Sequence, residues 1–140
     1  MARILLFQQN LLLRLSLWSV VSVFSGGILA LLSPSSSFWA AFGGMNAAWG
    51  MVNLLIASLG LYGVMKKMRT GIVDETREKH RLQRLLVVNA GLDVIYIAVG
   101  VAMATAGKTP LWQGFGWGII LQGGFLFLFD TFYYYRGGKL

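Results

Sequence analysis

Four long apolar stretches dominate the pattern of hydrophobic and polar positions, at about residues 11–32, 38–65, 85–106 and 111–135. Each is close to or above the ~20 residues that an α-helix needs to cross a bilayer. Because open strands cannot satisfy their backbone groups in lipid, these stretches are predicted to be helices. The sequence therefore predicts an all-α integral membrane protein, with residues 1–140 forming one transmembrane domain, a four-transmembrane-helix bundle.

The connections between the stretches predict two antiparallel hairpins. Residues 33–37 read Ser-Pro-Ser-Ser-Ser and residues 107–110 read Gly-Lys-Thr-Pro, both short and rich in turn formers and helix caps. The middle connection, residues 66–84, is long and charged. Its second half, from Asp74 to Arg84, has acidic residues near its start and an i,i+4 pair, Glu75–Lys79. We expect this half to be helical and to run unbroken into the third span.

The positions of lysine and arginine predict the orientation in the membrane. Eleven of the 12 basic side chains lie near the N-terminus, in the middle connection or near the C-terminus, and only Lys108 lies on the other side. Such an excess marks the cytoplasmic face. Both termini are therefore predicted to be cytoplasmic, in a multi-pass protein of a cell membrane. The membrane we expect is a prokaryotic inner (cytoplasmic) membrane.

Composition supports lipid as the surroundings of this chain. Hydrophobic residues make up 56% and charged residues 12%, with a mean hydropathy of +0.66, whereas soluble domains carry about 25% charged residues. The absence of cysteine excludes disulfides and thiolate metal sites. The net charge of +7 could suggest nucleic acid as a partner, but the charges lie at the ends of apolar spans, so none is expected.

Polar side chains within the spans are the candidate functional residues, because they are costly in hydrocarbon and usually face the bundle interior. On each span they recur at helical spacing, which predicts one inward polar stripe per helix. Ser16, Ser19 and Ser22 form the stripe of the first span. The predicted intramembrane cluster consists of Asn46, Asn53, Asn89, Asp93, Tyr96 and Gln122.

An ion-pairing group is predicted toward the cytoplasmic side, formed by Arg14, Asp93 and Asp130. Asp93 lies roughly 12 Å in from that end of its span, and Arg14 and Asp130 lie within about one helical turn of the same side. Arg14 could reach either aspartate and neutralise a buried carboxylate. One interpretation is a gated ion or proton site at Asp93. The other is a structural salt bridge with amide hydrogen bonds that fix the helix register, each worth about 0.6 kcal/mol.

Two further features concern packing and lipid contact. Small residues spaced by four predict close helix approach, namely Ser22–Gly26–Ala30, Gly43–Ala47, Gly44–Ala48, Gly100–Ala104 and Gly114–Gly118. Tyrosines 133–135 are typical of an interfacial aromatic belt. Lys66, Lys67 and Arg69 follow the second span and could contact anionic lipid headgroups.

Three segments carry a family resemblance. They are residues 46–53 (NAAWGMVN), 89–93 (NAGLD) and 122–130 (QGGFLFLFD). Together they resemble small four-span bacterial membrane proteins of unknown function. The resemblance covers most of the chain and implies no mechanism.

No enzymatic activity is expected, because the sequence offers no nucleophile–base pair or metal-ligand spacing, and no metal or cofactor is predicted. Two other functions stay open. The first is an accessory or assembly subunit that packs against other subunits of a larger membrane complex. The alternative is a small oligomeric transporter or channel for a solute or ion, which uses the intramembrane Asn/Asp/Gln cluster. Partners are the lipid bilayer and other membrane subunits or further copies of the chain.

Overall fold

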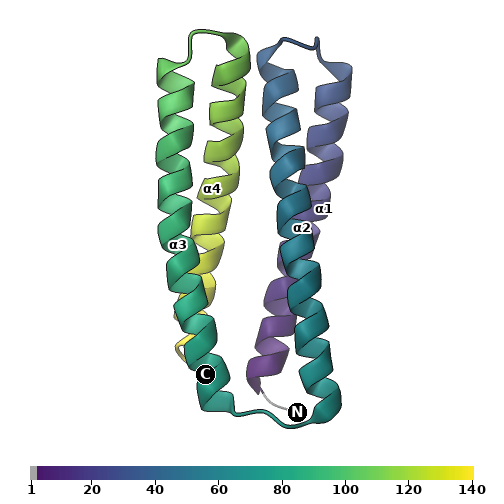
Figure 1. Cartoon of the computed structure of the whole chain (residues 1–140), viewed down its shortest axis with the longest axis vertical. Coiled ribbons are helices and arrows are strands. Elements are labelled where there is room, and N and C mark those ends of the chain that lie inside the picture. Colours follow the sequence, from purple (N-terminus) through teal and green to yellow (C-terminus); the bar gives the residue numbers. More distant parts are fainter. Residues whose placement is uncertain (1–2) are drawn as a thin grey trace.

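The computed structural model describes residues 3–140, and this part of the chain forms four helices (Figure 1). They are α1 (Arg3–Leu32), α2 (Phe38–Thr70), α3 (Glu75–Ala106) and α4 (Pro110–Gly137). All four are long and apolar enough to cross a membrane. The prediction of an all-helical chain with four such helices is confirmed, as befits a multi-pass membrane protein.

The helices are longer than the apolar spans that predicted them. α1 begins at Arg3 rather than near residue 11, and α2 continues through the first residues of the predicted middle connection to Thr70. Gly71 ends α2 in a left-handed conformation (φ 70°), with its N–H donating to the carbonyl of Lys67. The expected charged helix is present, and it runs unbroken into the rest of α3.

Capping side chains set where three helices begin. The oxygens of Ser37, Asp74 and Thr109 each accept a hydrogen bond from a backbone N–H in the first turn of the helix that follows. The α1–α2 and α3–α4 connections are consequently short, and each joins two antiparallel helices that pack along their length. The two hairpins meet mainly through α2 and α4, which run in the same direction.

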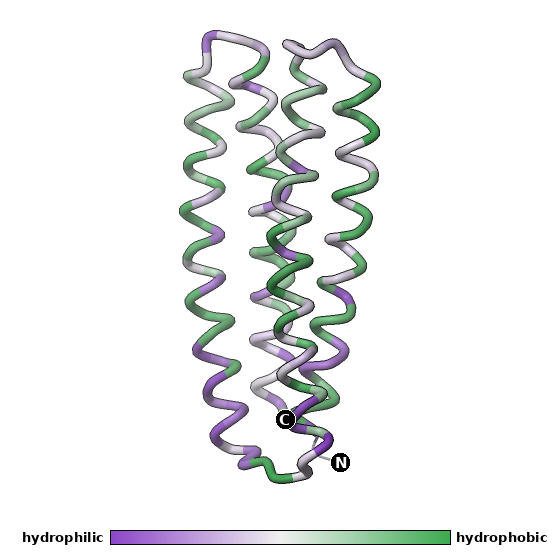
Figure 2. Tube along the Cα trace, turned by 45° about the vertical axis from the view of Figure 1, so that its right-hand side comes forward, coloured by the Kyte–Doolittle hydropathy of each residue, from purple (hydrophilic) through white to green (hydrophobic). Residues whose placement is uncertain are grey.

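The two ends of the bundle differ in polarity (Figure 2). The end that carries both termini and the α2–α3 connection, here called the charged end, is hydrophilic. The opposite end, with the two short connections, is called the loop end. At the charged end a buried apolar cluster joins all four helices, formed by Ile4, Leu5, Leu11, Val64, Leu82, Leu86 and Tyr133. Tyr133 is thus a core residue rather than part of the predicted interfacial belt.

Glycines let the helices approach closely. A Cβ atom on Gly43 would lie 2.5 Å from the carbonyl oxygen of Gly26, and one on Gly116 would lie 2.6 Å from that of Gly100. These contacts join α1 to α2 and α3 to α4, as the small-residue spacing predicts. Gly44 behaves differently, because a Cβ atom there would meet nothing within 4 Å.

Candidate functional site

Asp93 of α3 and Asp130 of α4 form a pair of buried carboxyl groups in the apolar body of the bundle. They are 3% and 8% exposed, and their carboxyl groups are close enough to interact directly. Helical side chains lean toward the N-terminus of their helix, which is at the charged end for α3 and at the loop end for α4. Because the helices are antiparallel, the two side chains lean toward each other.

Arg14 is not part of this pair. The single ion pair among residues 3–140 joins Lys67 to Glu78, whereas the guanidinium of Arg14 donates a 2.8 Å hydrogen bond to the hydroxyl of Tyr133. The helix face that carries Leu15 is buried, and Arg14 is turned by about 100° from it. The structure therefore brings together the two aspartates of the predicted ion-pairing group but not its arginine.

Two buried polar atoms near this level have no hydrogen-bond partner within the described chain, Asp93 Oδ2 and Asn53 Nδ2. The level of Asn53 follows from the packing of Gly118 against Met45, since α2 and α4 are parallel. Counting eight residues along each helix from this contact gives Asn53 on α2 and Leu126 on α4. Asn53 therefore lies about one helical turn from the level of Asp130. Unsatisfied buried polar atoms are costly, so we take the carboxyl pair as the candidate functional site.

Gln122 forms a second, fully bonded polar group nearer the loop end. Its side-chain amide donates to Ser22 (3.1 Å) and to Asn46 (2.7 Å), and its carbonyl oxygen accepts from the indole of Trp18 (3.0 Å). These partners belong to α1 and α2, so one buried side chain of α4 ties three helices together. The predicted cluster therefore divides, with Asn46 and Gln122 in this amide network and Asn53 and Asp93 near the carboxyl pair.

An aromatic ladder runs along α4 between these groups and the charged end. The ring of Trp18 stacks on Phe125 at 3.7 Å, and Phe125, Phe129 and Tyr133 follow at 5.8 and 4.7 Å between ring centroids. Their spacing by four residues places them on one helix face. This i, i+4 spacing is the sequence signal from which the aromatic face could have been predicted.

A cleft of about 300 Å³ lies in the charged-end half, where it separates α2 from α3 and is also lined by residues of α1 and α4. Its walls are apolar, and Asp130 and Asn89 are among the polar residues that line it. Two contacts bridge α2 and α3 beyond it, the Lys67–Glu78 ion pair at the charged end and the rings of Trp49 and Tyr96 (4.9 Å) toward the loop end. Ile56, Leu59 and Leu85 border the cleft and are more than half exposed, so the cleft opens sideways onto the apolar surface.

A second hollow of about 330 Å³ lies in the loop-end half, between α1, α2 and α4. Trp18, Ser22, Asn46 and Gln122 of the amide network line it. Asp130 of the carboxyl pair thus borders the first cleft, and the amide network borders the second hollow.

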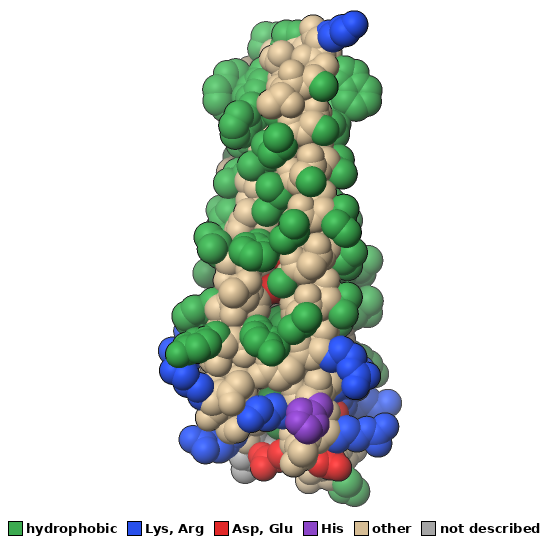
Figure 3. Space-filling view, turned by 90° about the vertical axis from the view of Figure 1, so that its left-hand side faces the viewer, with side chains coloured by type: hydrophobic (Ala, Val, Ile, Leu, Met, Phe, Trp, Pro, Cys, Tyr) green, Lys and Arg blue, Asp and Glu red, His purple; other side chains and the backbone are tan. Residues whose placement is uncertain are grey.

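Figure 3 shows basic side chains gathered around the charged end below an apolar body, in which an acidic side chain is recessed. Of the residues predicted to contact lipid, Lys66 and Arg69 are exposed, while Lys67 is engaged by Glu78. Burial raises the pKa of Glu78, but the hydrogen bond and charge of Lys67, helped by Gln8 and Arg81, outweigh it, so this pKa lies below its ordinary value of 4.5.

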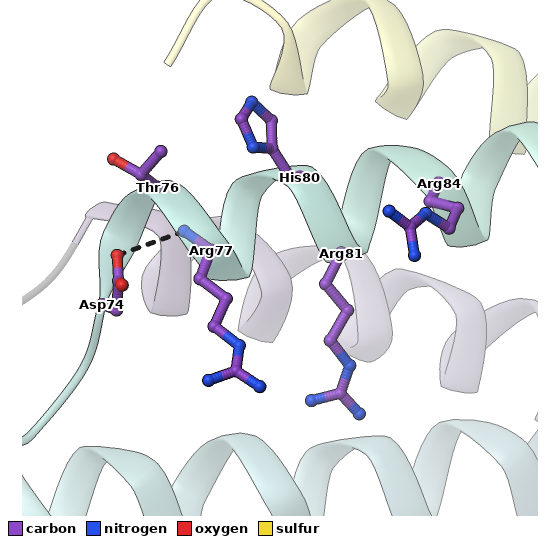
Figure 4. Close-up of a pocket in the computed structure, with 6 residues that line it drawn as sticks. All are labelled: Asp74, Thr76, Arg77, His80, Arg81 and Arg84. Carbon is purple, nitrogen blue, oxygen red and sulfur yellow. Dashed lines mark hydrogen bonds between the residues drawn. The ribbon is translucent and has the colours of Figure 1, made fainter.

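A basic hollow occupies the surface of the first turns of α3 (Figure 4). Figure 4 shows the side chains of Arg77 and Arg81 extended on one side of the helix and His80 on the other. All of the residues that line this hollow belong to one short stretch around the start of α3. It is an exposed basic surface, typical of contact with anionic headgroups.

The described residues contain no group of three or more histidine, cysteine, aspartate or glutamate side chains that could hold a metal ion. The carboxyl pair itself can bind a proton, accept hydrogen bonds and bind a cation.

Comparison with known proteins identifies the family. A family of unknown function, DUF6992, matches residues 14–131. The chain belongs to DUF6992. The expected membership of a family without an assigned function is confirmed, while a bacterial source stays a prediction. The match includes both aspartates and the amide network but ends before Tyr133. Searches of curated proteins and of solved structures each found no match.

Proposed function

We propose that this DUF6992 protein is a small proton-coupled solute carrier of a cell membrane, with both termini cytoplasmic. The observation that supports it is the Asp93–Asp130 pair, buried without a cationic partner among the described residues. Ionisable groups in hydrocarbon are expensive and usually belong to ion or proton pathways. A purely structural role is better served by a satisfied group such as Gln122.

Proton binding follows from the chemistry of the pair. Two adjacent carboxylates repel each other, and no counter-ion relieves the cost of burying their charge. With a proton on each, the pair is neutral and one carboxyl can donate a hydrogen bond to the other. A solute that favours an ionised carboxyl then displaces a proton, and this exchange couples the two.

The two hollows support a carrier rather than an open channel. The cleft lies in the charged-end half and the second hollow in the loop-end half, and the two share no lining residue. A carrier needs access to its site from each side in turn, with a closed layer in between. The basic charged end supports the orientation.

Transport can be tested without knowing the solute. The purified protein is reconstituted in liposomes under a pH gradient, and organic cations, neutral solutes and anions are added in turn. One class should dissipate the gradient with the wild type and not with Asp93→Asn or Asp130→Asn. Equal dissipation by the wild type and both variants, or none with any class, would contradict the proposal.

An accessory or assembly subunit is the second candidate. The Gln122 network supports it, because hydrogen bonds across three helices favour a rigid unit that docks through its outer faces. Gentle extraction followed by native mass spectrometry separates the two. A stoichiometric complex with a different membrane protein would favour the accessory subunit, whereas a monomer or homo-oligomer favours the carrier.

A further inference from the structure

The cleft between α2 and α3 combines three properties that together select a ligand. It opens sideways onto the apolar surface, its walls are mostly apolar, and a nearly buried carboxyl group borders it. A ligand that matches all three has an apolar body, reaches the cleft from the bilayer and carries a group that binds a carboxylate.

Charge decides between such ligands. The cleft is lined by four charged side chains: Lys67, Glu78, Arg81 and Asp130. Lys67 and Glu78 neutralise each other at the charged end, and Arg81 is exposed there. Asp130 is the only charged residue lining the cleft that lies away from this end. A head group that reaches it gains most if it is positive.

We propose that the α2–α3 cleft binds a lipophilic amine, with its ammonium group at Asp130 and its apolar chain along α2 toward the Lys67–Glu78 pair. This inference rests on the proposed function and names the class of its solute. The cleft volume of about 300 Å³ equals roughly ten water molecules at about 30 Å³ each, which suits a single alkyl chain.

The polar groups near Asp130 match an ammonium ion. A primary ammonium has three N–H donors and no acceptor. Asp130 offers carboxylate oxygens, and Asn89 offers its amide oxygen from the facing helix. Asp93 keeps its proton and donates to the ionised Asp130.

The exchange balances in charge and protons. The empty pair carries two protons and no charge. When an ammonium binds, one proton leaves Asp130 for water, and the positive ligand faces one carboxylate. The site stays neutral, so about one proton is released for each amine bound. In the pH range in which both carboxyls are protonated, the affinity for the amine should fall by up to tenfold for each unit by which the pH is lowered.

The test uses the full chain in phosphatidylcholine nanodiscs, with decylamine as the probe and decanol and decanoate as chain-matched controls. Isothermal titration in buffers of different ionisation enthalpy measures affinity and proton release together, with empty nanodiscs as the background. We expect decylamine to bind at least tenfold more tightly than either control, with release of about one proton. Asp130→Asn should abolish that preference and the proton release.

Two glycines of α2 provide matched cleft variants. A Cβ atom meets nothing within 4 Å at Gly63 or at Gly44, so a side chain added at either position starts in open space, but only Gly63 lines the cleft. Gly63→Leu should weaken decylamine binding at least tenfold, and Gly44→Leu should leave it unchanged. Equal effects of the two substitutions, or decanol or decanoate binding as tightly as decylamine, would overturn the proposal.

The failure of this inference differs from failure of the proposed function. Proton-coupled flux of another solute, without decylamine binding, would refute the amine site alone. Decylamine binding that releases a proton, without any proton-coupled flux in liposomes, would refute the carrier and leave the amine site standing.

Discussion

The carboxyl groups of Asp93 and Asp130 face each other between α3 and α4, while Arg14 donates its hydrogen bond to Tyr133 instead. This arrangement separates two interpretations of the polar stripe. A structural salt bridge would place the arginine on a carboxylate. The charges of a carboxyl pair without a cation do not stabilise the fold. Such a pair can instead bind a proton or a cation.

Replacing either aspartate by asparagine should therefore not destabilise the fold. Asp93→Asn and Asp130→Asn keep the shape and a hydrogen bond, so the free energy of unfolding should stay within about 1 kcal/mol of the wild type or rise, because removing one partner of a buried ion pair is what costs about 3–5 kcal/mol. Unfolding in mixed micelles with a denaturing detergent measures it. A loss of that size in either variant would mean that the carboxylate has a cationic partner.

The adjacent glycines 43 and 44 should respond in opposite ways to alanine. A Cβ atom at Gly43 would lie 2.5 Å from the backbone oxygen of Gly26 and 2.9 Å from the backbone nitrogen of Ala30, whereas one at Gly44 meets nothing. Overpacking of this kind costs about 1–3 kcal/mol. Gly43→Ala should lower the unfolding free energy by that amount, and Gly44→Ala should leave it unchanged or raise it. Similar effects of both would contradict the close α1–α2 contact.

Much of the fold could be predicted from the sequence, because each helix is determined locally. The lipid-spanning lengths, the capping residues Ser37, Asp74 and Thr109, and the charged start of α3 are all properties of short segments. Only the helix ends were underestimated, since an apolar span stops where its charges begin while the helix continues to Thr70.

The contents of the site could be predicted only in part, because helical spacing gives the direction of a side chain within its own helix. It does not give the rotation of one helix relative to another. Arg14 and Asp130 are near the same depth, yet the buried face of α1 turns Arg14 away. In the same way Gly43 and Gly44 both fit a small-residue pattern, and only the packing of α1 distinguishes them.

Gln122 should prove structural. Gln122→Met keeps the volume of the side chain but removes three hydrogen bonds to α1 and α2. At about 0.6 kcal/mol per bond within a membrane bundle, the expected loss is about 2 kcal/mol. Unfolding in mixed micelles measures the loss, and any proton-coupled flux should persist at the temperature where the variant is folded. A loss of flux without a loss of stability would move Gln122 into the transport site.

The Lys67–Glu78 pair should make stability pH-dependent at acidic pH. Since the folded-state pKa of Glu78 is lowered, its contribution is present above the ordinary value and is lost as the pH falls through the folded-state pKa. The pair is partly exposed, so the contribution is at most about 1 kcal/mol. Glu78→Gln should remove this part of the pH dependence below about pH 4.5 while leaving the neutral-pH fold intact. Identical acid profiles for variant and wild type would refute it.

The orientation can be tested directly, because the chain has no cysteine and every single-cysteine variant reports on one position. Ser35 and Lys108 lie in the two short connections, and His80 lies at the charged end, all three exposed. In intact cells a membrane-impermeant maleimide should label Ser35→Cys and Lys108→Cys, while His80→Cys should react only after the membrane is opened. The excess of lysine and arginine on one side is the reason for this expectation. Labelling of His80→Cys in intact cells, with protection of the other two, would show the opposite orientation. The cleft at Asp130 would then take up its proton from the other side of the membrane.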